Sequence, residues 1–239
     1  MTTDTPDVLP LALLDQVATA TTRLLDTART LTDADVIAPS LLPGWTRGHV
    51  LAHLSRNADS LVNLLIWART GIETPQYASP FLRDFDIDAG APRPLTEQVI
   101  DLEASAARWS ALATTAPPQS WRATVRTRAG RAIPAAEVPW MRLLEVEIHH
   151  VDLNSTYTPA GWPTPFVHRT LTQATTDLGR SIRSPFTIRA TDTDFTTTLG
   201  PGTPTHTIEG PTPALLAWLI GRSPGTDLTG DLPNLPAWR

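Results

Sequence analysis

The chain has 239 residues, 41% of them hydrophobic and 18% charged, which is typical of a globular protein and excludes a disordered or fibrous one. Its net charge of −5 gives no basic surface for nucleic acid, and all 19 basic residues are arginine, so Schiff-base chemistry through a lysine is excluded. Cysteine is absent, which excludes disulfides, a thiolate nucleophile and cysteine-ligated metals.

The N-terminal stretch, MTTDTPDVLPLALLDQ, lacks the positive region and the long apolar core of a signal peptide. No later run approaches the roughly 20 apolar residues that a membrane span requires. We therefore expect a cytoplasmic protein that binds neither membrane nor nucleic acid. We also expect it to be a monomer.

Four stretches in the N-terminal part have the apolar spacing of amphipathic helices. They cover approximately residues 11–31, 46–70, 96–112 and 139–153. Thr46 is suited to cap the second helix, Gly71 to end it, and Pro139 to occupy the first turn of the fourth. Residues 72–94 are expected to form a loop punctuated by proline and glycine. Four antiparallel helices of this length predict a bundle over residues 1–155.

The pattern changes beyond Asn154. TYTPAGWPTP reads as a turn-rich linker, and a helix is expected over residues 165–182. Short strands are predicted for the segments FTIRATD, DFTTTLG and THTIEG. The apolar segment 213–221 is predicted to be a buried helix. The predicted fold class is therefore mixed, with a four-helix bundle followed by a smaller α+β domain over residues 156–239.

Polar side chains lie on the apolar side of the second helix. An α-helix turns by about 100° per residue. With Val50 at the origin of the helical wheel, Asn57 lies at about −20° and His53 at about −60°. His49 lies at the margin of the apolar side, at about −100°. Asn57 and His53 are therefore predicted to point into the bundle.

The fourth helix, PWMRLLEVEIHHVDL, carries a second set of polar residues. On its wheel Glu145 and Asp152 lie on the apolar side, and His149 lies beside that side, one turn from Glu145. Glu147 and His150 lie on the opposite side, where we expect them to be solvated. Glu145 and His149 are therefore placed as two ligands of one ion would be.

These inward-facing groups indicate a metal site. An unpaired buried charge is costly, and a divalent ion among His53, Glu145 and His149 would remove that cost. Two histidines and one glutamate leave an open coordination position, as in catalytic zinc sites, although the same donors suit nickel, iron or manganese. The spacing alone leaves open that these residues are ordinary satisfied polar groups. His168 and His206 stand in no comparable context.

Several segments resemble the mycothiol-dependent maleylpyruvate isomerases, whose DinB-like metal-binding four-helix bundle precedes a small α+β domain. The similarity covers nearly the whole chain and is carried by LPGWTRGHVLAHLSRNAD, WARTGIETPQYAS, DIDAGA, RLLEVEIHHVDL and LLAWLIGRS. Two of these motifs, LPGWT…H and ExxxH, are shared with DinB-like relatives of other activity. The resemblance implies His53, Glu145 and His149 as zinc ligands and Arg222 as a catalytic arginine. Leu144 stands where the family has an arginine, a departure that touches no ligand.

The resemblance also implies a reaction, the cis–trans isomerisation of maleylpyruvate to fumarylpyruvate with mycothiol as the thiol cosubstrate. A thiolate that adds to the conjugated alkene leaves a single bond free to rotate, and its elimination restores a trans alkene. Zn²⁺ would hold mycothiol as a thiolate, and Arg222 would bind a substrate carboxylate or the enolate. We expect Asn57 and Asp152 to orient the imidazoles.

Other functions are compatible with the same residues. A mycothiol S-transferase would keep the three ligands but form a stable thioether with an electrophile. A non-catalytic binding or regulatory module would use the metal only structurally or bind none. Hydrolysis by zinc-bound water is disfavoured because the sequence offers no separate general base.

Overall fold

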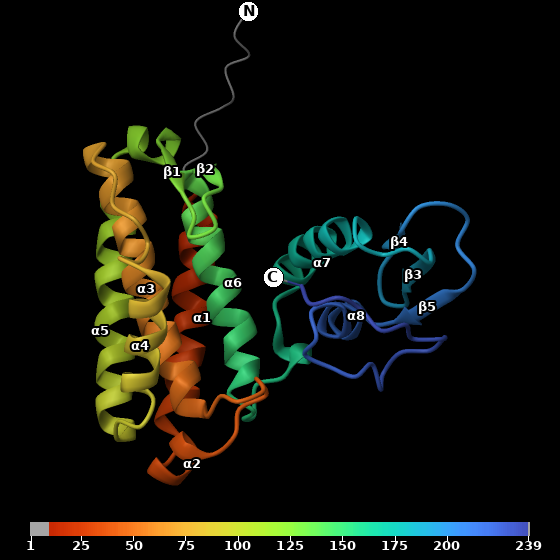
Figure 1. The fold of residues 1–239 in the computed structure, drawn as a ribbon, viewed down its shortest axis with the longest axis horizontal. Coiled ribbons are helices and arrows are strands. Elements are labelled where there is room, and N and C mark those ends of the chain that lie inside the picture. Colours follow the sequence, from red (N-terminus) through yellow and green to blue (C-terminus); the bar gives the residue numbers. More distant parts are fainter. Residues whose placement is uncertain (1–9, 239) are drawn as a thin grey trace, which may run out of the picture. The chain divides into compact units, whose positions relative to one another are not determined.

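The computed structural model describes residues 10–238 (Figure 1). The chain divides between Thr156 and Tyr157 into two compact units, a helical one and a smaller one of helices and strands. This confirms the predicted fold class. No helix within residues 10–238 has the length and apolar character needed to cross a membrane.

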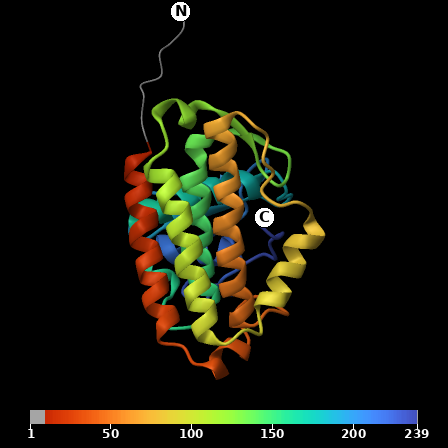
Figure 2. The same cartoon turned by 90° about the vertical axis from the view of Figure 1, so that its left-hand side faces the viewer.

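Four long helices build the first unit and lie side by side in Figure 2. They are α1 (Leu11–Arg29), α3 (Arg47–Thr70), α5 (Leu95–Thr114) and α6 (Val138–Asp152). Their inward-facing apolar side chains are buried and form the core of the unit. The core includes Val17, Leu24, Leu51, Leu54, Leu61, Leu64, Leu102, Leu143 and Val146. The predicted bundle is therefore confirmed.

The ends of α3 are set by the residues that the sequence indicates. The Thr46 side chain accepts a hydrogen bond from the backbone N–H of His49, and the imidazole of His49 accepts one from the N–H of Thr46. These reciprocal bonds satisfy two donors that the first turn would otherwise leave unpaired. Gly71 ends the helix with a φ of 75°, the left-handed conformation that glycine adopts without steric cost.

Neighbouring helices are not all antiparallel, so this part of the prediction is wrong. Between α3 and α5, Arg56 pairs with Asp101 and Arg108 pairs with Asp59, so residue numbers rise in the same direction along both helices. These two helices therefore run parallel, whereas α3 and α6 run antiparallel. A parallel pair needs a segment that returns the chain to the starting end of the bundle.

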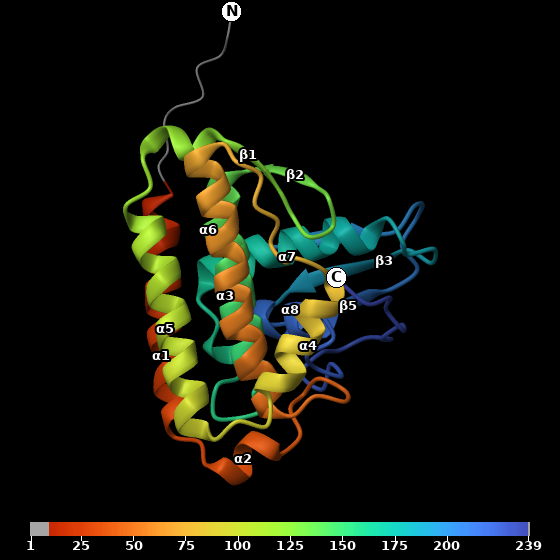
Figure 3. The same cartoon turned by 60° about the vertical axis from the view of Figure 1, so that its left-hand side comes forward.

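That returning segment is residues 72–94, which the sequence predicted as a loop. It contains α4 (Pro80–Gly90), which lies beside α3 (Figure 3). The helix begins with Ser79 as N-cap, whose hydroxyl accepts a hydrogen bond from a backbone N–H one turn later, and with proline in its first turn. Phe81 and Phe85 are 73% and 57% exposed, so α4 lacks the buried apolar stripe by which helices are recognised in sequence.

Shorter elements complete the first unit. They are α2 (Asp33–Ile37), two 3₁₀ turns, η1 (Pro118–Arg122) and η2 (Ala135–Glu137), and a hairpin of β1 (Thr124–Arg126) and β2 (Ala132–Pro134). In the hairpin, Val125 lies opposite Ile133 and both side chains are buried. Strands of this length are too short for sequence alternation to reveal.

The second unit packs two helices with a three-stranded sheet. Its elements are η3 (Pro159–Gly161), α7 (Thr164–Gly179), β3 (Phe186–Ala190), β4 (Thr196–Leu199), β5 (Thr207–Gly210) and α8 (Thr212–Leu219). β3 is central, antiparallel to β4 and parallel to β5. Ile188 and Ile208 form a buried cross-strand pair, and α8 is almost entirely buried, as its apolar sequence predicts.

Candidate metal centre

His53 lies on the buried side of α3, as the helical wheel predicts, and is 5% exposed. Its ring is 5.5 Å from that of Trp45, and its Nε2 is 2.9 Å from Oε2 of Glu145 on α6. Burial lowers the pKa of His53 even though Glu145 favours its charged form. The imidazole is therefore suited to stay neutral, the form that ligates metals.

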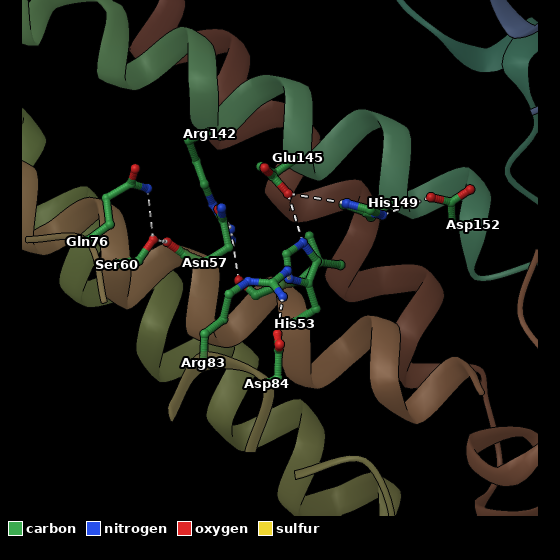
Figure 4. Close-up of polar contacts among 11 residues, drawn as sticks. His53, Asn57, Ser60, Gln76, Arg83, Asp84, Arg142, Glu145, His149 and Asp152 are labelled. Atoms are coloured by element: carbon green, nitrogen blue, oxygen red, sulfur yellow. Dashed lines mark hydrogen bonds and ion pairs between the residues drawn. The ribbon is translucent and has the colours of Figure 1, made fainter. Parts of the chain in front are cut away.

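Glu145 and His149, one turn apart on α6, face His53 (Figure 4). His149 Nε2 lies 3.3 Å from the same Glu145 oxygen, and the two imidazole rings meet edge to face at 4.6 Å. Potential ligand atoms of all three residues lie within 4.8 Å of one another. The structure thus brings together the three residues that the sequence singled out.

The donor set fits a divalent metal. Zinc–nitrogen and zinc–oxygen bonds of about 2.1 Å at tetrahedral angles put donor atoms about 3.4 Å apart. The observed separations from Glu145 Oε2 are 2.9 Å to His53 Nε2 and 3.3 Å to His149 Nε2. These two separations lie within about 0.5 Å of that value, and ligand atoms of all three residues lie within 4.8 Å of one another. Three donors of this kind leave a coordination position for a further ligand.

Asp152 fixes the orientation of His149. The Asp152 side chain is completely buried, and its Oδ2 lies 2.8 Å from His149 Nδ1. A carboxylate on one ring nitrogen leaves the other, Nε2, facing Glu145, which is the usual arrangement around metal-ligating histidines. Asp152 therefore orients an imidazole, as expected from the sequence.

The charges of this cluster are set by contact among its members. Burial works against the charged form of His149, but its hydrogen bonds to Asp152 and Glu145 prevail and raise its pKa to about 9. Burial likewise opposes ionisation of Glu145, but hydrogen bonds from His149 and His53 hold the pKa of its carboxyl well below the ordinary value. A metal ion entering at neutral pH must therefore displace the proton of His149.

The role predicted for Asn57 is wrong. Asn57 is buried, but its Oδ1 accepts a hydrogen bond from Arg142 Nη1 at 2.9 Å rather than contacting an imidazole. The same Nη1 donates to the Leu54 carbonyl at 2.8 Å. Arg142 is 1% exposed, and burial lowers its pKa to about 10. Arg142 could not be recognised from the sequence, because arginine on a helix is normally exposed.

Arg83 and Tyr77 also reach the centre, from the segment predicted as a loop. Arg83 Nη2 lies 3.4 Å from His53 Nδ1, and its guanidinium carbon is 5.8 Å from the centroid of the Tyr77 ring. Burial raises the pKa of Tyr77, which is therefore neutral at physiological pH. Ser79 and Pro80, which begin α4, are the sequence signal that could have indicated Arg83.

Glu147 and His150 are buried, contrary to the prediction that they are solvated; each is 1% exposed. Arg23 of α1 binds Glu147 at 2.5 Å, and His150 Nε2 is 2.8 Å from Thr27 Oγ1 of the same helix. Packing against α1 covers this side of α6, which the wheel of an isolated helix cannot show. The partly exposed side chains on α6 are those of Met141, Glu145 and His149. The metal-binding side of α6 is thus its most accessible side.

The remaining candidates lie in the second unit. Arg222 follows α8, and its Nη1 donates a hydrogen bond to the Ile220 carbonyl at 2.9 Å. His168 is exposed on α7, and His206 stacks on Phe186 with ring centroids 5.7 Å apart. Within residues 10–238, neither histidine joins a cluster of metal-ligand side chains.

Comparisons with known proteins agree with this architecture. The family model of the mycothiol maleylpyruvate isomerase N-terminal domain matches residues 17–154. A crystal structure of the mycothiol-dependent maleylpyruvate isomerase is similar with a TM-score of 0.91 and 28% identity, over 97% of this chain and 98% of that chain. A mutant of that isomerase with one histidine changed to alanine gives the same values. A search of curated proteins found no match. The fold of the whole chain and the match over residues 17–154 show that this protein belongs to the mycothiol maleylpyruvate isomerase N-terminal domain family.

Proposed function

We propose that the protein is a mycothiol-dependent isomerase that converts maleylpyruvate to fumarylpyruvate. The observation that carries the proposal is the convergence of His53, Glu145 and His149 on one point, in a fold shared over 97% of the chain with an isomerase of that activity. We also propose zinc as the ion, because two imidazoles and one carboxylate with an open position are a zinc donor set.

The reaction needs a nucleophile that adds and then leaves. A thiolate forms a carbon–sulfur bond to the alkene, whose π electrons move onto the conjugated carbonyl as an enolate. The former double bond rotates, the enolate electrons rebuild it in the trans form, and the carbon–sulfur bond breaks to return the thiolate. The chain contains no cysteine, so the thiol is a cosubstrate, and the related isomerase is mycothiol-dependent.

The residues of the centre have distinct tasks. A divalent ion, when bound, lowers the pKa of a thiol that it coordinates. His53 and His149 would hold the ion through Nε2 and Glu145 through Oε2, the atoms that face one another. Asp152 keeps His149 in the tautomer whose Nε2 is free to bind. Arg222 is proposed as the catalytic arginine that binds a substrate carboxylate or the enolate.

The test is an assay of zinc-loaded protein with maleylpyruvate, with and without mycothiol, followed by the ultraviolet change on isomerisation. We expect turnover only with mycothiol, and loss of both zinc and activity in His53→Ala. His168→Ala changes an exposed histidine and should alter neither. Conjugation of a model electrophile without turnover of maleylpyruvate would replace this proposal by an S-transferase.

A further inference from the structure

Two guanidinium groups reach the same turn of α3 beside the metal centre. Arg142 extends from α6 and donates from Nη1 to the Leu54 carbonyl and to Asn57 Oδ1. Arg83 extends from α4 and brings its Nη2 to 3.4 Å from His53 Nδ1. Figure 4 shows both side chains reaching toward this stretch of α3. Like charges repel most strongly where water is excluded, so an anion bound beside both groups would stabilise this arrangement.

The charge of Arg142 has no counter-ion in the described part of the chain. Its side chain is 1% exposed, and its Nη2 has no hydrogen-bond partner. The carboxylate that most affects its charge is that of Glu145, which is not hydrogen-bonded to it. A buried cation with an unused donor is costly, and such groups in native proteins call for a ligand or another explanation.

Arg83 is only partly neutralised. Its Nη1 pairs with Asp84 at 2.6 Å, but the Asp84 side chain is 65% exposed, so solvent screens this pair. Tyr77, whose ring lies beside the guanidinium, stays neutral and supplies a hydroxyl rather than a charge. The Arg83 side chain itself is 16% exposed, so most of its charge is held inside the protein.

The balance of charge indicates how many anions the centre can take. With a divalent ion bound, the carboxylates of Glu145 and Asp152 balance its charge, and the two histidines are neutral ligands. The guanidiniums of Arg83 and Arg142 remain in excess inside the protein, because the Asp84 carboxylate that pairs with Arg83 is mostly in solvent. A coordinated thiolate and one carboxylate would together neutralise them.

We propose that Arg142 and Arg83 form a carboxylate subsite beside the metal centre, in which Arg142 Nη2 binds the carboxylate carried by the substrate's cis alkene. The inference rests on the proposed function for the identity of the substrate, a dicarboxylate. It deepens that function by assigning the group that holds the alkene next to the thiolate. A planar guanidinium suits this task because it binds a carboxylate in a fixed orientation.

The test is the binding of maleate, a short cis-dicarboxylate, to zinc-loaded protein without any thiol, followed by calorimetry. Loss of a hydrogen bond to a charged group should raise the Kd for maleate about 10- to 100-fold in Arg142→Gln, and about 10-fold in Arg83→Gln. The zinc content should stay at the parent level. Arg29→Gln removes an arginine that is 51% exposed on α1 and should bind maleate as the parent does. Parent-like binding by both Arg142→Gln and Arg83→Gln overturns the subsite.

Arg142 also ties α6 to α3, so its replacement can unfold the protein. Arg83→Gln changes a largely buried side chain of α4, which lies outside the four long helices, and keeps the test decisive in that case. A crystal structure of the parent with maleate adds a direct measurement. A carboxylate oxygen within about 3.2 Å of Arg142 Nη2 supports the subsite, and maleate bound to the metal alone overturns it.

These outcomes are separate from those of the proposed function. Maleate binding involves no thiol and no isomerisation. Failure to turn over maleylpyruvate would reject the function even where maleate binding depends on both arginines. Unchanged maleate binding in the variants would reject the subsite even where the isomerase assay succeeds.

Discussion

Asp152 shows how one buried side chain prepares another for metal binding. Its carboxylate lies at the end of α6, wholly buried, and holds the Nδ1 side of His149 at 2.8 Å. This contact fixes the ring orientation and, in the neutral ring, the nitrogen that carries the proton. The carboxylate also increases the basicity of the imidazole, which strengthens its bond to a metal.

Replacing Asp152 by asparagine should therefore weaken metal binding without removing a ligand. The amide keeps the size of the side chain but loses the charge that makes His149 basic. We expect zinc affinity to fall about 10- to 100-fold, measured by competition with a chelator. Asp26→Asn, at a side chain that is 65% exposed, is the matched control. Equal affinity of parent and Asp152→Asn would show that His149 needs no such support.

Residues on one helix could be placed from the sequence, whereas residues brought in by tertiary packing could not. The helical period placed His53 on the inner side of its helix and placed Glu145 and His149 on or beside the inner side of theirs. Arg142 and Arg83 were not predicted as site residues, because their role depends on the backbone and side-chain atoms of α3 that they contact. No local sequence pattern predicts contacts between different helices.

At the scale of elements, α6 is covered on every side except that of the metal centre. Glu147 and His150 lie in the interface with α1, so this interface contains ionisable groups. Burial, with a smaller effect from Arg23, lowers the pKa of His150 to about 4. The neutral imidazole is therefore part of the α1–α6 packing.

This interface should make stability depend on pH. An unfolded chain protonates His150 near pH 6.5, whereas the folded protein does so only near pH 4, so folding loses stability as the pH falls between these values. We expect this histidine to account for a loss of about 3 kcal/mol. The measurement is urea unfolding of the parent and of His150→Gln at pH 7.5 and 4.5. The same pH-dependent loss in both proteins would contradict the assignment.

The close approach of α3 to the chain that leads from α4 into α5 depends on a residue without a side chain. A Cβ built on Gly48 would lie 2.1 Å from the Ala91 carbonyl oxygen and 2.9 Å from Gln98 Nε2. We expect Gly48→Ala to destabilise the protein by about 3 kcal/mol, measured by thermal or urea unfolding, because backbone must move to admit the methyl group. Gly179→Ala, where the nearest atom is the Gly200 nitrogen at 3.9 Å, should be tolerated. A neutral Gly48→Ala would show that the contact relaxes freely.

Elements with a buried apolar stripe and clear caps were predictable, and those without were not. The limits of α3 follow from Thr46 and Gly71. The helix α4 was not predicted because its Phe81 and Phe85 face outward. Without α4, the direction of α5 relative to α3 was also predicted wrongly. Helix direction in a bundle is decided by the segments between helices, where apolar periodicity carries least information.

At the scale of the whole molecule, the proposed ligands all come from the first unit, residues 1–156. Arg222, the proposed catalytic arginine, belongs to the second unit, residues 157–239. Metal binding and isomerisation should therefore be separable.

We expect a fragment of residues 1–156 to bind one zinc ion with an affinity close to that of the full chain and to lack isomerase activity. Metal analysis and chelator competition measure the first property, and the maleylpyruvate assay measures the second. Circular dichroism checks that the fragment is helical. A helical fragment that holds no zinc would place a ligand in the second unit.

The three donors come from one turn of α3 and one turn of α6. Insertions or deletions between Glu145 and His149 would therefore disrupt the site. One codon inserted between those for Glu145 and His149 would turn one donor away from the other by about 100° and displace it by about 1.5 Å along the helix axis. The hairpin at residues 124–134 has no such constraint. Insertions and deletions among functional homologues should therefore gather in the hairpin and leave the spacing of these two residues unchanged.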